Sequence, residues 1–200
     1  MRLVCIHVGK TGGVHVHRVL RDGRIDHTWL GHCTPLTQAA TDYQSDTLLI
    51  GIREPVAHAL SAFDARRRRP GNWDQREAGF FKRFPDPQTW CESLGTPEAD
   101  SAFEFLGHVS GGLPHYFHGD FPSVLSRTWI YDTNTLTRCM DVLCARLETA
   151  VPDENRRKHN AAPIAMTVSR DARERLVRHL GDAIELYREL QPLTLTRRGV

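Results

Sequence analysis

The chain has 200 residues, with 26 Lys or Arg against 24 Asp or Glu. This length fits a single domain over residues 1–200, with enough apolar content for a core. The near balance of charge gives no reason to expect nucleic acid or a membrane as a partner. The first apolar run, residues 3–8, is too short for a signal-peptide core or a membrane span. Five cysteines without a C-x-x-C pair are typical of reduced thiols, so we expect a cytoplasmic protein.

Short apolar runs alternate with helical patterns along the first third of the chain. Residues 3–8 predict a buried strand, and apolar residues at helical spacing follow as far as Leu20. Residues 47–52 predict a second buried strand, and a helix follows that starts at Pro55 and continues to Phe63. The strand–helix unit is therefore expected twice.

The rest of the chain is less regular. The pattern predicts a surface excursion over 66–95, a helix over 97–107, a third strand over 127–131, and apolar helical stripes over 136–147 and 176–187. Apolar strands that alternate with helices favour a parallel sheet covered on both faces, with ligands beyond the carboxyl ends of the strands. We expect an α/β, P-loop-like three-layer fold with a central parallel sheet flanked by helices.

The turn Gly9-Lys10-Thr11-Gly12-Gly13 lies between the first strand and its helix. Free backbone N–H groups and the positive end of a helix form an anion site there. Lys10 adds a mobile charge and Thr11 a hydroxyl. A Walker A loop would need a glycine five positions before Gly9, where the chain has Val4, so the spacing excludes that motif. A Gly-rich turn that merely joins a strand to a helix is the plainer alternative.

A second turn follows residues 47–52. Arg53 ends the strand and Ser61 lies eight positions further on, about two turns into the helix. The guanidinium can grip a phosphate through two hydrogen bonds, and the serine hydroxyl adds a donor. The alternative is that Arg53 caps a neighbouring helix and Ser61 has no special role.

Residues 6–13 and 53–63 together resemble the two signature segments of PAPS-dependent sulfotransferases, particularly the carbohydrate branch. PAPS is 3′-phosphoadenosine 5′-phosphosulfate. The resemblance implies that the first segment holds the 5′-phosphosulfate and that Arg53 and Ser61 hold the 3′-phosphate. It also implies that PAPS is the co-substrate and that the acceptor is a hydroxyl of a carbohydrate-like molecule.

Two further segments resemble this family more weakly. Gly31-His32 is similar to the Gly-His of the 2-O-sulfating carbohydrate enzymes, which implies that His32 is the base. Residues 159–163 are similar to an Asn-containing segment of related bacterial proteins. The chain departs from the family where Gly9 replaces a proline and where Val14-His15 replaces Thr-Ser. His15 can supply a replacement N–H donor.

These residues predict a mechanism without a metal ion. The cofactor-binding residues are expected to be Lys10, Thr11, Gly12, Gly13, Val14, His15, Arg53 and Ser61. Lys10 neutralises charge on the departing phosphate oxygen while backbone amides hold the phosphosulfate. A histidine with a pKa near neutrality is suited to take the acceptor's proton. We expect this base to be His32, with His15 or Glu54 as substitutes.

Other functions fit parts of the sequence. A P-loop small-molecule kinase would need Asp46 or Asp132 as magnesium ligands. A non-catalytic module would bind nucleotide and transfer nothing. The run Arg66–Arg69 fits a polyanionic acceptor, a solvated helix end or, less well, nucleic acid. Three histidines near one another, His108, His115 and His118, raise the alternative of zinc.

Overall fold

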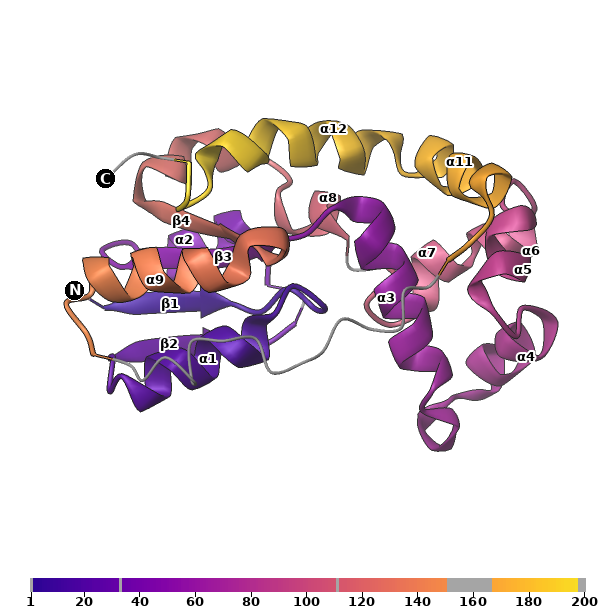
Figure 1. Cartoon of the computed structure of the whole chain (residues 1–200), viewed down its shortest axis with the longest axis horizontal. Coiled ribbons are helices and arrows are strands. Elements are labelled where there is room, and N and C mark those ends of the chain that lie inside the picture. Colours follow the sequence, from indigo (N-terminus) through magenta and orange to yellow (C-terminus); the bar gives the residue numbers. More distant parts are fainter. Residues whose placement is uncertain (1, 33, 111, 151–166, 198–200) are drawn as a thin grey trace.

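The chain is built on a four-stranded parallel sheet in the order β2-β1-β3-β4 (Figure 1). This computed structural model describes residues 2–32, 34–110, 112–150 and 167–197. The strands are β1 (Leu3–Ile6), β2 (His27–Leu30), β3 (Thr47–Ile52) and β4 (Thr128–Asp132). In the register of the sheet, Cys5 pairs with Trp29 on one side and Leu49 on the other. Because all pairs are parallel, the carboxyl ends of the strands share one edge.

Helices cover both faces of the sheet. Side chains of successive strand residues point to opposite faces, so Leu3 and Cys5 pack on one face and Val4 and Ile6 on the other. The first face is covered by α1 (Gly13–Asp22) and α9 (Leu136–Arg146). The second is covered by α2 (Leu36–Asp42), α8 (Leu113–Tyr116) and α12 (Gly181–Leu190). The predicted α/β fold with a central parallel sheet between helices is confirmed.

A third apolar cluster lies beside the sheet and consists of helices alone. Its helices are α3 (Pro55–Arg67), α4 (Gln75–Arg83), α5 (Pro87–Glu92), α6 (Pro97–Asp100), α7 (Ala102–Phe105) and α11 (Arg170–His179). The rings of Phe63 and Trp90 stack at its centre, 4.9 Å apart. The prediction of a surface excursion over 66–95 is therefore wrong: the segment forms helices, and Phe80, Phe81, Phe84 and Trp90 are buried in this cluster.

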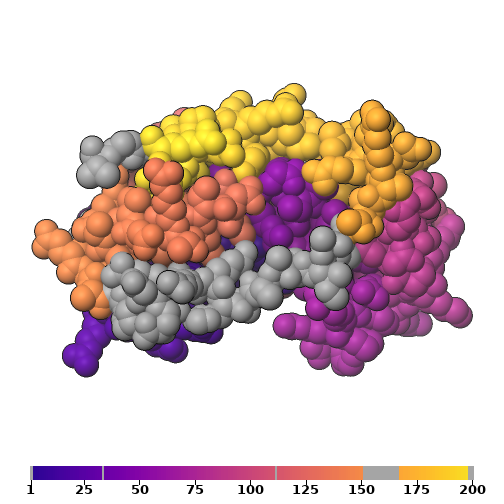
Figure 2. Space-filling model, in the orientation of Figure 1, coloured from indigo at the N-terminus to yellow at the C-terminus, as the bar shows by residue number. Residues whose placement is uncertain are grey.

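The helices α11 and α12 follow one another along one long side of the molecule (Figure 2). They connect the second face of the sheet to the helical cluster. Tyr187 of α12 packs on that face, and Leu176 of α11 packs in the cluster. The described ranges also contain short 3-10 segments at Pro70–Asn72, Phe121–Arg127, Thr133–Thr135 and Gln191–Leu193. No helix in the described ranges is long and apolar enough to cross a membrane.

Several predicted boundaries differ from the structure. The first strand ends at Ile6, two residues early, because Val8 already belongs to the turn. The helix expected over 97–107 is two short helices, and the stripe over 176–187 is divided between α11 and α12. Strand β2 was not predicted: it is a half-buried edge strand of four residues that lacks the continuous apolar run of β3.

Candidate functional site

The turn between β1 and α1 adopts an unusual backbone. Lys10 has a φ of 64° and Gly12 a φ of 85°, both in the left-handed region. Only glycine adopts that region without strain, so the Lys10 conformation must be held by its surroundings. No described side chain caps the N-terminus of α1, and its first turn carries no acidic residue. The first amides of α1 therefore lie at the cavity wall, where an anion can use them.

Side chains from two other elements, and one hydroxyl of the turn itself, hold this turn by hydrogen bonds. His58 Nε2 on α3 lies 2.9 Å from the carbonyl oxygen of Gly9. The hydroxyl of Thr133, just after β4, donates to the carbonyl oxygens of Thr11 and Ile52 at 2.9 and 3.1 Å. The hydroxyl of Thr11 donates to the Val8 carbonyl at 2.8 Å, and the residue is fully buried. Thr11 is absent from the cavity lining and its hydroxyl is used inside the protein, contrary to the expected role of that hydroxyl.

The two predicted anion-binding segments meet in the structure. Arg53 Nη1 donates to the carbonyl oxygen of Lys10 at 2.9 Å. Ser61 lies buried in α3, and no hydrogen bond joins its hydroxyl to a described residue. Glu54 caps α3 by accepting from the amides of Val56 and Ala57, at 3.1 and 2.7 Å. A carboxylate held in this way is poorly placed to act as a base.

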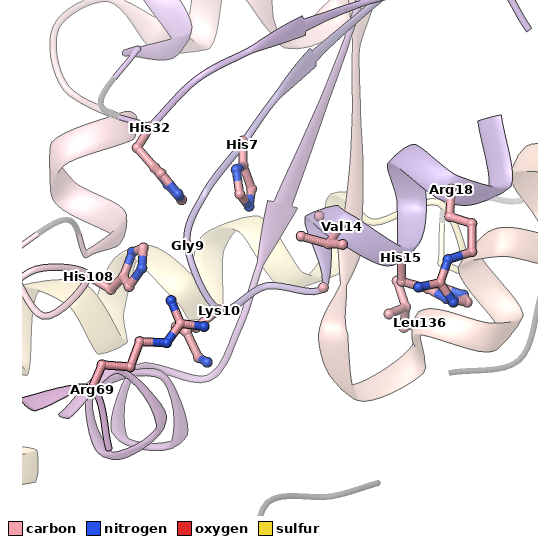
Figure 3. A pocket seen from close by; sticks show the side chains of 12 residues that line it. His7, Gly9, Lys10, Val14, His15, Arg18, His32, Arg69, His108 and Leu136 are labelled. Carbon is pink, nitrogen blue, oxygen red and sulfur yellow. The ribbon is translucent and has the colours of Figure 1, made fainter. Parts of the chain in front are cut away.

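A cavity of about 290 Å³ opens at the turn (Figure 3). Its wall includes Lys10 and the backbone of Gly9, Gly12 and Gly13. The other lining residues are His7, Val14, His15, Arg18, His32, Arg69, His108 and Leu136. No carboxylate belongs to this described lining, so the cavity is cationic. The Val14 side chain is 61% exposed at the mouth of the cavity.

The pKa of Lys10 is lowered from its ordinary value. Burial is the main cause, and the positive charges of Arg53, Arg69 and Arg68 add to it. A cation that is repelled by its neighbours gains when an anion binds among them. The electrostatics of the turn therefore favour an anionic ligand.

The four residues of the run Arg66–Arg69 have different partners. Arg66 forms a salt bridge with Glu77 at 2.5 Å, and both Arg67 and Arg68 pair with Asp64. Arg69 follows α3 and lines the cavity instead. In Figure 3 its guanidinium lies beside Lys10. Most of the run is thus paired within the helical cluster, and one member joins the site.

Of the histidines that line the cavity, His7, His32 and His108 lie together at the side away from Arg18, and His15 lies beside Arg18 (Figure 3). The ring of His32 lies 4.1 Å from the ring of His7 and 4.7 Å from that of His108, measured between centroids. Burial, together with the charge of the neighbouring histidines, lowers the pKa of His7 to about 4. Burial, His32 and Lys10 lower the pKa of His108 to about 4 as well. Both rings are neutral at pH 7.

His7 was not predicted as a site residue, and the sequence raised His108 only as part of the alternative zinc site. His7 directly follows the first strand, where the sequence pattern indicates only a strand residue. His108 is about a hundred residues from the turn, and only the path of the chain after α7 brings it there. Its φ of 69° was not visible in the sequence, which predicts a helix as far as residue 107.

Other predicted site residues lie elsewhere. His108 faces His32 rather than the pair His115 and His118, whose rings are 6.3 Å apart. In the part of the chain that the structure describes, no group of three His, Cys, Asp or Glu residues could hold a metal ion. Residues 159–163 lie outside the described residues.

The two carboxylates that a kinase would use are also badly placed for that role. Asp46 precedes β3 and therefore lies at the edge of the sheet opposite Lys10. Asp132 ends β4 at the same edge as Lys10, but it accepts from the Tyr187 hydroxyl at 2.8 Å and from the Asn134 amide at 2.9 Å.

Comparison of the chain with known protein families, with curated proteins and with solved structures finds no match. Inferences about activity therefore start from the site itself. Chemically, the site offers a strained cationic turn, free helix amides, a guanidinium that touches the turn, and neutral imidazoles beside it.

Proposed function

We propose that the chain is a P-loop-like sulfotransferase that moves a sulfuryl group from PAPS to a hydroxyl of a carbohydrate-like acceptor. The contact between Arg53 and Lys10 carries this proposal. PAPS has anionic groups on both sides of its ribose, so its binding site needs two cationic groups that one nucleotide can reach. The 2.9 Å hydrogen bond from Arg53 to the Lys10 carbonyl brings the guanidinium next to the turn, which supports a site of this kind.

The proposed reaction uses residues of one cavity. The acceptor oxygen forms a bond to sulfur while the bond between sulfur and the bridging phosphate oxygen breaks. His32 takes the hydroxyl proton, and Lys10 neutralises the charge that develops on the phosphate oxygen. The amides of Gly12, Gly13 and Val14 lie at the same wall and would hold the phosphosulfate. His15, which is 8% exposed, lines this wall too.

The placement of carboxylates favours sulfuryl transfer over phosphoryl transfer. A kinase needs carboxylates near the phosphates to hold magnesium. Asp46 is at the opposite sheet edge, and the carboxylate of Asp132 is held by Tyr187 and Asn134. Transfer that relies on Lys, Arg and backbone donors fits this cationic cavity better.

The test measures transfer and binding separately. Wild type is incubated with PAPS labelled in its sulfur and with a panel of glycans and small hydroxyl compounds, and 3′-phosphoadenosine 5′-phosphate is titrated by calorimetry. We expect labelled product from wild type and none from Lys10→Ala. Arg53→Ala should weaken nucleotide binding about 10- to 100-fold, since charge-assisted hydrogen bonds are lost. The matched controls are Lys82→Ala and Arg173→Ala, which change exposed cations of α4 and α11.

Three outcomes contradict the proposal or parts of it. Unchanged nucleotide affinity in Arg53→Ala would remove the cofactor site. Tight nucleotide binding without transfer to any acceptor would leave a non-catalytic binding module. Stabilisation by ATP with Mg²⁺ but not by 3′-phosphoadenosine 5′-phosphate, in a thermal-shift assay, would favour the kinase.

A further inference from the structure

His108 reaches the cavity from a strained point of the chain. It lies between α7 and α8, and its φ of 69° is in the left-handed region. Histidine tolerates that region better than most residues, but it is uncommon outside glycine. Residues held in such strained conformations occur preferentially at functional sites. The contacts of the His108 imidazole indicate the role of this strained backbone conformation.

The His108 ring occupies space that Gly9 leaves open. A Cβ atom on Gly9 would lie 2.3 Å from His108 Nδ1 and 3.0 Å from its Cγ. Both atoms are near the base of the ring, so the whole imidazole would have to move. Gly9 does not have a positive φ, which means that its backbone does not demand glycine. Position 9 requires glycine because the His108 ring fills the space that a side chain would take.

The same imidazole contacts His32. The two rings meet edge to face, with centroids 4.7 Å apart and planes 62° apart. On its other side His32 meets His7, at 4.1 Å and 33°. His7 itself packs on the turn, because a Cβ on Gly13 would lie 2.6 Å from His7 Cδ2. His32 is thus held between two rings, each of which rests on a glycine of the anion-binding turn (Figure 3).

We propose that His108 is a positioning residue, which fixes the His32 imidazole over the cavity by ring contact and depends on the absence of a side chain at Gly9. The inference rests on the proposed function in that His32 is taken as the group that accepts the acceptor's proton. The charged or titratable groups near His108 among the described residues include Lys10, Arg66 and Arg69 and the imidazoles of His7, His32 and His58. Because the His108 ring is neutral at pH 7, it packs against His32 without repelling it.

The experiment is a double-mutant cycle between positions 9 and 108. His108→Gly removes the ring and also suits the left-handed backbone, so this variant should fold. Gly9→Ala adds the methyl group that displaces the ring. We expect either change to lower kcat for sulfuryl transfer about 10- to 100-fold, with KM for PAPS within about twofold of wild type. In the double variant the added methyl group meets no ring, so the loss should equal that of His108→Gly alone. Gly79→Ala, with no atom within 4 Å of the new Cβ, is the control.

A second readout needs no activity. The Cε1–H signal of His32, assigned by its loss in His32→Gln, reports the rings around it. It should move in Gly9→Ala and in His108→Gly, and adding the Gly9 substitution to His108→Gly should move it no further. Additive losses of kcat in the cycle, or a His32 signal that neither substitution shifts, would overturn the inference. If wild type transfers no sulfate, the proposed function fails and the signal alone decides whether His108 positions His32.

Discussion

His58 Nε2 lies 2.9 Å from the carbonyl oxygen of Gly9, which ties the first turn of α3 to the turn after β1. The imidazole is buried, and burial lowers its pKa from 6.5 to about 4 in spite of the hydrogen bond to Gly9. The folded protein therefore contains a neutral His58 that donates to the turn. Protonation at low pH would place a charge inside the helical layer.

This relationship predicts a loss of stability in acid. Because the pKa of His58 is lower in the folded than in the unfolded chain, the folded state binds fewer protons between pH 6.5 and about 4. Its contribution is complete above pH 6.5 and is lost as the pH falls towards 4. The difference corresponds to about 3 kcal/mol. Urea unfolding at a series of pH values should give a shallower acid slope for His58→Gln than for wild type. Equal slopes would place the acid sensitivity in His7 and His108 instead.

A second prediction concerns Thr133. Its buried hydroxyl donates to the carbonyl oxygens of Thr11 and Ile52, and so connects the turn after β1 to the ends of β3 and β4. Thr133→Val keeps the shape but leaves both carbonyls without this donor, which should lower the free energy of unfolding by about 1–3 kcal/mol. Thr133→Ser retains the hydroxyl and should lose much less. Chemical denaturation of the three proteins distinguishes a hydrogen-bond effect from a packing effect.

The sequence predicts the part of the site that is local to each turn. The strand–helix boundaries at Gly9 and Arg53 follow from apolar runs that end at glycine or arginine, and parallel strands place both turns at one edge. The sequence cannot predict His108, because its approach depends on the path of the chain after α7 and on empty space at Gly9. Nor does it reveal that the Thr11 hydroxyl turns inward to Val8. Such contacts are set by packing rather than by local pattern.

Gly51 should tolerate no side chain. A Cβ there would lie 2.5 Å from the Tyr131 hydroxyl oxygen and 2.6 Å from Thr11 Oγ1. Overpacking of this kind costs about 1–3 kcal/mol, so Gly51→Ala should lower the melting temperature and loosen the turn. The same substitution at the exposed Gly79, inside α4, should raise stability by about 0.5–1 kcal/mol because alanine favours a helix. Opposite shifts in melting temperature are expected, and a destabilising effect at both positions would contradict the packing argument.

Arg69 should influence Lys10 through charge. Its guanidinium lies beside Lys10 at the cavity, and its positive charge helps to lower the pKa of that lysine. Arg69→Ala should therefore move the pKa of Lys10 up towards its ordinary value, as followed by NMR of the Nζ group. It should also weaken binding of 3′-phosphoadenosine 5′-phosphate and flatten the dependence of affinity on salt, since exposed charges are screened. Arg68→Ala provides the comparison, because Arg68 is paired with Asp64 and its charge is already partly offset. If both substitutions altered affinity equally, the arginine run would act as a diffuse positive surface and Arg69 would have no particular place in the site.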